Sequence, residues 1–300
     1  MELRVGQRAT LQRTFTQEDF NRFADLSGDD NPIHVDEEFA ASTYFGRTVA
    51  HGMLLYSTLS SLLGKQLPGP GSWQVEQELM FPAPTFSGEP VDFTVEVSGF
   101  PTNQLVEVST RVTRADGEAG ATGKAILRLP GEHARPPAKL SIPSGSPETG
   151  LPPGSQEIHL KGLSTGQQAS IKRTYTQTDL SIYAELTGDM NPLFADAPFA
   201  KRNGFEGVII PGPLLGALFS YLLGTRLPGR GTNWLKQSLS FQRPAYPQVE
   251  IIARVEIIRL RPEKNLVNLR TTCVDQAGAL LCDGEALVAV RDLLAEDRKV

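Results

Sequence analysis

A short segment of the chain carries side chains that together can activate a water molecule. Asp29, Asn31 and His34 fall within six residues, and the pair His51-Gly52 follows seventeen residues after His34. Carboxylates and imidazoles are common general acids and bases near neutral pH. If Asp29 and His34 lie on a turn rather than a helix, both can point at one water, so we expect acid–base chemistry here.

The start of an apolar segment offers a second kind of chemistry. A long apolar helix is predicted over roughly 51–64. The backbone N–H groups of its first turn lack partners within the helix, and the helix dipole favours negative charge there. Because Gly52 has no side chain, it would let an oxygen atom approach these donors closely.

Local signals predict the elements that hold these residues. Thr16 followed by Asp19 resembles a capping box, and it begins an amphipathic helix that ends at Gly28. Pro32 keeps Asn31 out of helical geometry, which favours a polar turn at this point.

The pattern changes after the apolar helix. Four segments alternate polar and apolar residues, as strands do: WQVEQELMF, VDFTVEVSGF, QLVEVSTRVTR and GKAILRLP. A buried helix followed by antiparallel strands is an α+β layout.

The chain repeats itself at an offset of 160 residues. Segment 13–32 (RTFTQEDFNRFADLSGDDNP) aligns without a gap with 173–192 (RTYTQTDLSIYAELTGDMNP), and the register persists for about 80 residues. We therefore predict a duplicated domain, with copies at 1–130 and 165–300. Between them, 131–164 is rich in Pro, Gly and Ser and is predicted to be a linker.

Composition limits the class of protein. The 300 residues carry 29 Lys+Arg against 34 Asp+Glu, a net charge of −5, without basic blocks, which argues against nucleic-acid binding. The apolar run 207–225 is broken by two prolines and four glycines, so we expect no membrane span. Cys273 and Cys282 form no metal-ligand pattern, and with no signal peptide recognisable at the start we expect a cytoplasmic protein. No cofactor motif and no metal site is predicted.

The motifs SGDDNPIHVDEEFA and TVAHGMLLYSTLSSLLG together resemble the MaoC-like dehydratase family, which includes the (R)-specific enoyl-CoA hydratases. The resemblance implies a double hot-dog fold, in which each copy wraps an antiparallel sheet around one long helix. It also implies reversible syn addition of water to a trans-2-enoyl thioester, giving the (3R)-hydroxyacyl thioester.

The resemblance assigns roles to residues of the first copy. Asp29 and His34 would hold and activate the water, and Asn31 would brace their turn. Gly52 would place backbone N–H groups near the thioester oxygen, where they stabilise enolate charge. Ser60 matches a helix serine that contributes to the family's site.

The second copy departs from this pattern. Asp189, Asn191, Gly212 and Ser220 occupy matching positions, but Phe194 replaces the first histidine and a proline replaces the second. Phenylalanine cannot transfer a proton. We therefore expect one working copy and one degenerate, non-catalytic copy that completes the sheet and the pocket.

The expected substrate is an acyl-CoA, with acyl-ACP as an alternative carrier, and the expected assembly is a monomeric double hot dog or a homodimer. Three other functions stay open at this point: an acyl-CoA thioesterase, an acyl-ACP dehydratase and a non-catalytic acyl-binding protein.

Overall fold

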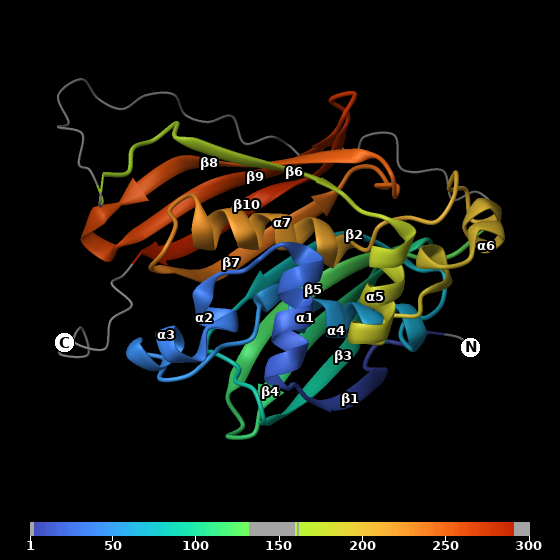
Figure 1. Ribbon diagram of the computed structural model, residues 1–300. Helices are drawn as coiled ribbons and strands as arrows, with labels where there is room; N and C mark the ends of the chain where they lie inside the picture. Colours follow the sequence, from blue (N-terminus) through green and yellow to red (C-terminus); the bar gives the residue numbers. More distant parts are fainter. Residues whose placement is uncertain (1–2, 132–159, 161, 291–300) are drawn as a thin grey trace.

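The computed structural model describes residues 3–131, 160 and 162–290, so most of the predicted linker lies outside the described residues. The first copy contains β1 (Arg8–Thr14), α1 (Gln17–Ser27), α2 (Pro32–Val35), α3 (Glu37–Ser42), α4 (Gly52–Lys65), β2 (Trp73–Met80), β3 (Pro90–Thr102), β4 (Leu105–Arg114) and β5 (Ala119–Arg128). The second copy contains β6 (Gln168–Thr174), α5 (Gln177–Thr187), the 3-10 turn η1 (Pro192–Phe194), α6 (Ala197–Arg202), α7 (Gly212–Thr225), β7 (Thr232–Phe241), β8 (Glu250–Arg261), the 3-10 turn η2 (Pro262–Lys264), β9 (Leu266–Asp275) and β10 (Leu280–Val290). Figure 1 shows the two copies stacked, each with its own set of strands.

Within the described residues, the strands of both copies form one sheet of ten, in the order β1-β3-β4-β5-β2-β7-β10-β9-β8-β6. The copies meet where β2 pairs antiparallel with β7, and Glu78 faces Ser238 at the middle of that pairing. These two residues are equivalent in the repeat, since 238 − 78 = 160. The copies are therefore related by an approximate two-fold axis that passes between Glu78 and Ser238.

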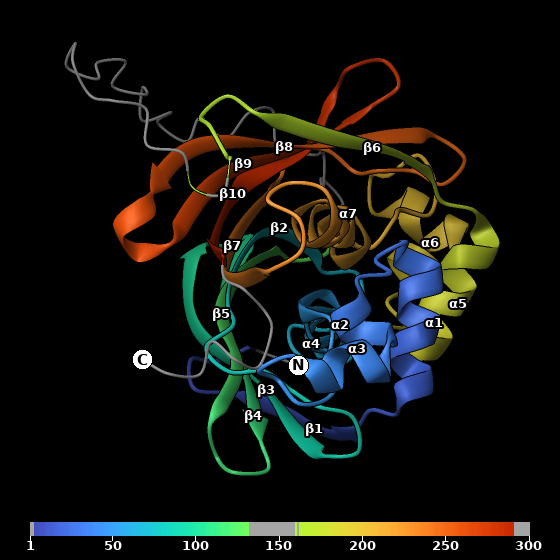
Figure 2. The ribbon, with the colours of Figure 1, turned by 60° about the vertical axis from the view of Figure 1, so that its left-hand side comes forward.

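The sheet curves around the two long helices, α4 and α7, which pack against each other (Figure 2). Every residue of α4 from Met53 to Gly64 is buried. A helix buried on all sides needs no polar face, and the hydroxyls of Ser57 and Thr58 in α4 donate to backbone oxygens of the same helix. The sequence therefore shows a mostly apolar run here rather than an amphipathic stripe.

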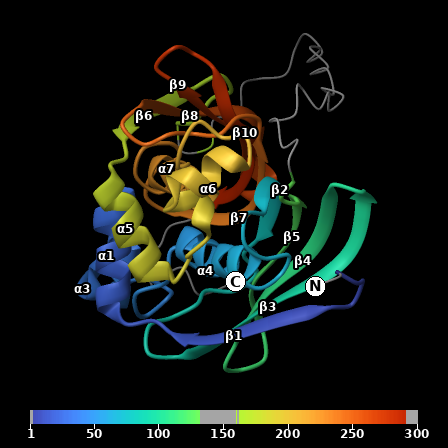
Figure 3. The ribbon, with the colours of Figure 1, turned by 90° about the vertical axis from the view of Figure 1, so that its right-hand side faces the viewer.

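Helices α1 and α5 lie side by side on the flank of the molecule (Figure 3). Arg22 of α1 and Glu185 of α5 form an ion pair of 2.9 Å between the copies. Because both side chains are largely exposed, this pair contributes little stability, and the shared sheet and helices hold the copies together.

Most of the local predictions are confirmed. Thr16 and Asp19 form a capping box, and Gly28 ends α1 in the left-handed conformation at φ 81°. Asn31 is extended, with ψ 124°, as the following proline requires. Strand β1 was not predicted, because only Ala9 of its residues is buried and the segment lacks an apolar face.

One local prediction needs correction. His34 was expected on a turn, but it lies in the single helical turn α2. Asn31 provides the N-cap of this turn and Pro32 its first residue, a combination that favours the start of a helix.

Cys273 and Cys282 are both buried and free, and they face each other on β9 and β10. Burial raises the pKa of both thiols, so neither is a reactive nucleophile. Within 3–131 and 162–290, no helix is long and apolar enough to cross a membrane.

Candidate active site

Asp29, His34 and His51 form one buried cluster in the first copy. One oxygen or ring nitrogen from each lies within 4.8 Å of those of the other two. Asp29 follows α1, His34 lies in α2, and His51 directly precedes α4. The side-chain oxygen of Asn31 accepts the N–H of Ile33 at 3.4 Å, and this cap starts the helical turn that brings His34 close to Asp29.

The hydrogen bonds of the two histidines define their tautomers. Nδ1 of His34 lies 2.7 Å from the carbonyl oxygen of Val49, so Nδ1 carries the proton, because a carbonyl can only accept. In neutral His34, Nε2 is therefore a proton acceptor. Nε2 of His51 donates in the same way to the backbone oxygen of Asp29 at 2.9 Å.

His51 positions its neighbours. Its ring stacks on that of His34, with centroids 3.9 Å apart and planes at 29°. The same side chain therefore supports the imidazole of His34 from one side and holds the backbone of Asp29. Burial, with the nearby His34, keeps the pKa of His51 well below its usual value, so the ring is neutral at pH 7.

Burial also sets the protonation of the pair itself. It raises the pKa of Asp29 above its usual value, and the nearby His34, the Ser220 hydroxyl and the N–H of Asn31 oppose that rise. It lowers the pKa of His34, while Asp29 opposes the change. The two shifts bring a carboxylate and an imidazole towards similar affinity for a proton, as proton exchange between them requires.

The carboxylate of Asp29 is buried and has no hydrogen-bond partner on either oxygen among the described residues. The Ser220 hydroxyl and the N–H of Asn31 lie beside it without forming a hydrogen bond of normal geometry. Burying an acceptor without a donor costs about 1–3 kcal/mol or more. Both oxygens thus remain available to a donor molecule such as water.

Gly52 begins α4, and its N-cap residue, His51, provides no side-chain hydrogen bond to the first turn. A Cβ at Gly52 would lie 2.8 Å from Cζ of Phe81. A larger residue at this position would therefore force the Phe81 ring to move, and the small size of glycine leaves the N–H groups of the helix start accessible.

Ser60 does not lie where the sequence indicated, and this prediction needs correction. Its hydroxyl donates to Asp189 of the second copy at 2.7 Å. The serine beside Asp29 is Ser220, from α7 of the second copy. Because of the two-fold arrangement, each long helix directs its serine towards the aspartate of the opposite copy.

A cavity of about 280 Å³ lies at the first-copy site. His34, Asn31 and Gly52 line it together with Ser220 and Trp234 of the second copy. Both copies thus form its walls. Most of its other lining residues are apolar or aromatic, as expected of a site for a hydrocarbon chain: Ile33, Tyr44, Phe45, Val49, Ala50, Leu55, Phe81, Pro82, Ala83, Pro84 and Leu223.

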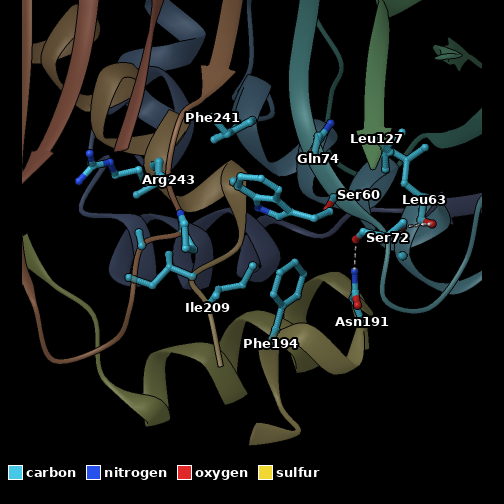
Figure 4. Close-up of a pocket in the computed structure, with 17 residues that line it drawn as sticks. Ser60, Leu63, Ser72, Gln74, Leu127, Asn191, Phe194, Ile209, Phe241 and Arg243 are labelled. Atoms are coloured by element: carbon cyan, nitrogen blue, oxygen red, sulfur yellow. Dashed lines mark hydrogen bonds between the residues drawn. The ribbon is translucent and has the colours of Figure 1, made fainter. Parts of the chain in front are cut away.

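The equivalent cavity of the second copy is almost closed, with a volume of about 30 Å³ (Figure 4). Phe194 lines it in place of a histidine, and Ile210 stands where the first copy has Ala50. Asp189 accepts hydrogen bonds from Ser60 and from the N–H of Asn191. The second carboxylate is therefore fully partnered and has no space around it for a substrate.

Asp29, His34 and His51 are also the group that could share a metal ion within the described residues. The stacked rings make this arrangement unfavourable. Ring lone pairs lie in the ring plane, so in two rings stacked at 29° they run side by side and do not converge on one point. The cluster suits proton transfer better than metal coordination.

Comparison with known proteins places the chain in a family. The model of the MaoC like domain matches residues 4–119 and again 161–277. The (R)-specific enoyl-CoA hydratase of Aeromonas caviae is 43% identical over 128 residues, which cover 43% of this chain and 96% of that protein. A mitochondrial 3-hydroxyacyl-[acyl-carrier-protein] dehydratase of Solanum lycopersicum is 36% identical over 136 residues, 45% of this chain and 81% of that protein.

A solved structure described as a MaoC-like dehydratase superposes with a TM-score of 0.75 at 19% identity and covers 96% of this chain and 99% of that chain. The chain belongs to the MaoC-like dehydratase family and has a double hot-dog fold, as the sequence predicted. It is accordingly an enzyme of the hydro-lyase class.

The sequence motifs missed the residues that the second copy contributes to this site, among them Ser220 and Trp234. Ser220 lies in the second copy and aligns with Ser60, so the sequence predicted that it would lie beside Asp189 of its own copy. The alignment of the two serines was the available signal, but it does not show which aspartate each one faces.

Proposed function

We propose that the protein is an (R)-specific enoyl-CoA hydratase, which adds water reversibly and syn to a trans-2-enoyl-CoA to give the (3R)-3-hydroxyacyl-CoA in fatty-acid metabolism. The main support is the buried pair of Asp29 and His34. Neither carboxylate oxygen of Asp29 has a hydrogen-bond partner among the described residues, and His34 lines the same cavity as Gly52. The similarity to the Aeromonas caviae hydratase supports the same reaction over the length of about one copy.

In this mechanism, Asp29 and Nε2 of His34 hold one water by accepting its two hydrogens. The water oxygen bonds to C3 of the enoyl group as one proton passes to the pair. The π electrons of the C2–C3 bond move towards the thioester oxygen, where the N–H of Gly52 stabilises the enolate. The pair then returns a proton to C2 on the same face, so one molecule of water is added and the pair is regenerated.

The second copy has a supporting role in this proposal. It supplies Ser220 beside Asp29 and part of the cavity wall. Its own cavity is closed, and Phe194 cannot exchange protons. One active site per chain is therefore proposed, in the first copy.

The test is incubation with crotonyl-CoA and chiral analysis of the product. Formation of (3R)-hydroxybutyryl-CoA supports the hydratase. Release of free CoA would instead indicate a thioesterase, and binding without turnover would indicate an acyl-binding protein. A parallel assay with crotonyl-ACP determines which carrier is preferred, and enoyl-CoA substrates of increasing length determine the acyl range.

A single chain already contains two hot dogs and both walls of the site, so we propose that a monomer suffices for activity, with a homodimer as the alternative. Light scattering on the eluted protein distinguishes the two. We also propose that the protein is cytoplasmic, which fits its two free cysteines.

A further inference from the structure

The end of helix α7 lies directly against the turn that carries the proposed water-activating pair. Gly224, in the last turn of α7, contacts Asn31 of the first copy. A Cβ at Gly224 would clash with Nδ2 of Asn31 and lie 3.3 Å from its Cγ. Gly224 has no positive φ, so its backbone conformation does not require glycine. Because glycine within a helix costs about 0.5–1 kcal/mol relative to alanine, its presence here has a packing reason.

Asn31 is the residue through which a displacement would reach the site. Asn31 is 6% exposed, so it has little access to solvent. Its side-chain oxygen accepts the N–H of Ile33, and its backbone oxygen accepts the N–H of His34 at 2.9 Å. Any shift of Asn31 would therefore move the N-cap of α2, and with it His34.

We propose that Gly224 is a positioning residue for the reaction. Because it has no side chain, Asn31 can pack directly against α7, and this contact fixes the position of His34 relative to Asp29. The second copy thereby sets the geometry of the first copy's site through Gly224, which lines the cavity beside Asn31 and acts on His34 only through that residue. This inference rests on the proposed function for its kinetic readout.

The repeat supplies a matched control. Gly64 of α4 holds the equivalent position, and a Cβ there would lie 2.8 Å from Cβ of Asn191 and 3.1 Å from a carboxylate oxygen of Asp189. Gly64→Ala should therefore cause a similar steric conflict, but in the copy where Phe194 replaces the histidine. The two variants differ in which turn they displace.

The experiment compares the full-length chain with Gly224→Ala and Gly64→Ala, using two readouts. The first is kcat and KM with crotonyl-CoA. The second is the imidazole ¹H–¹⁵N spectrum, which is simple because the chain has four histidines. Thermal melts show how far each variant is destabilised.

Gly224→Ala should lower kcat about tenfold or more, since small displacements of reacting groups are costly. It should also shift the ring signals of His34 and His51. Gly64→Ala should keep kcat within about threefold and leave those signals in place. If Gly224→Ala behaves like Gly64→Ala in both readouts, the inference is wrong.

A double variant tests the route through Asn31. Asn31→Ser keeps a capping oxygen but removes Nδ2, so adding Gly224→Ala to it should change kcat by less than about threefold. An undiminished loss in that background would show that Gly224 does not act through Asn31. If Gly224→Ala alone does not fold, this double variant decides: it should fold and match Asn31→Ser, and failure to do so overturns the inference.

The kinetic and spectroscopic readouts also separate the two proposals. Absence of hydration of enoyl-CoA substrates of every length by the unmodified chain would overturn the proposed function. In that case, the ring signals of His34 and His51 would still decide whether Gly224 positions the turn.

Discussion

The hydroxyl of Ser60 donates a 2.7 Å hydrogen bond to the carboxylate of Asp189, which lies 129 residues further along the chain and in the other copy. Ser220, at the equivalent position, lies beside Asp29. Each aspartate is thus completed by the helix of the opposite copy. The duplication therefore provides more than a cover for the sheet, because it supplies part of the proposed active site.

The two serines should differ in their effect on catalysis. Ser220→Ala removes a group that favours the ionised form of Asp29, so the pKa of Asp29 should rise further. We expect turnover at neutral pH to fall severalfold and the acid limb of the rate profile to move to higher pH. Rate profiles for hydration between pH 5 and 8 measure this.

Ser60→Ala is the control for that experiment. It leaves an oxygen of Asp189 without its donor, which should cost about 1–3 kcal/mol of stability. Turnover should stay within about threefold. If Ser60→Ala lowers turnover as much as Ser220→Ala, the assignment of Ser220 to the working site is wrong.

Asp29 and His34 should account for most of the rate of hydration. Asp29→Asn or His34→Ala should each lower hydration by roughly 10²–10⁴-fold, the range typical of acid–base groups. The circular dichroism spectrum should be unchanged. Retention of more than a tenth of the normal rate by either variant would exclude the role proposed for that residue.

The pH dependence of the unmodified enzyme follows from the two pKa directions. The pKa of His34 lies below its usual 6.5 and that of Asp29 above its usual 3.8. At neutral pH the imidazole is therefore neutral, and the proposed water activation requires Asp29 to be ionised there although its pKa is raised. kcat/KM should be constant near pH 7 and fall only below about 6.5 as the pair takes up protons. A loss of rate beginning above pH 7 would contradict this protonation state.

Asp189→Asn should change the stability of the protein without changing its turnover. Burial raises the pKa of Asp189 from 3.8 to about 6, so between these values the folded chain binds more protons than the unfolded chain. Stability should therefore fall as pH rises through this window and then remain lower. Asp189→Asn should remove that slope and stabilise the protein at pH 7 by up to about 3 kcal/mol.

Denaturant titrations at several pH values measure the slope for Asp189→Asn. Its turnover should stay within about threefold of normal, because Phe194 provides no partner for proton transfer. A large loss of turnover without a loss of stability would show that the second copy takes part in the chemistry.

Residues 1–135 alone should not form an active monomer. Without the second copy, β2 loses its hydrogen-bonding partner β7 and becomes an exposed edge. Asp29 loses Ser220, and Asn31 loses its contact with Gly224. We expect aggregation or a homodimer in which Ser60 of each chain takes the place of Ser220 beside the other chain's Asp29.

Size-exclusion chromatography with light scattering, run beside a hydration assay, measures the outcome for residues 1–135. Activity should appear only in the dimer fraction. A monodisperse monomer with full activity would show that the second copy is not needed to complete the site.

The family, the duplication and the local structure around the site could all be predicted from the amino-acid sequence alone. The capping box at Thr16, the extended Asn31 before Pro32 and the helix that begins at Gly52 all depend on neighbours within a few residues. For that reason their patterns were readable without a structure. The replacement of a histidine by Phe194 was equally visible.

Which copy completes which site depends on how the two copies pack against each other. Ser60 and Ser220 have equivalent sequence surroundings, so no local pattern distinguishes the aspartate that each one faces. That choice depends on the pairing of β2 with β7 about Glu78 and Ser238, which packs α4 against α7 and directs each helix to the opposite turn. Contacts between residues more than 100 positions apart arise from such packing, and the periodicity of a single segment does not encode them.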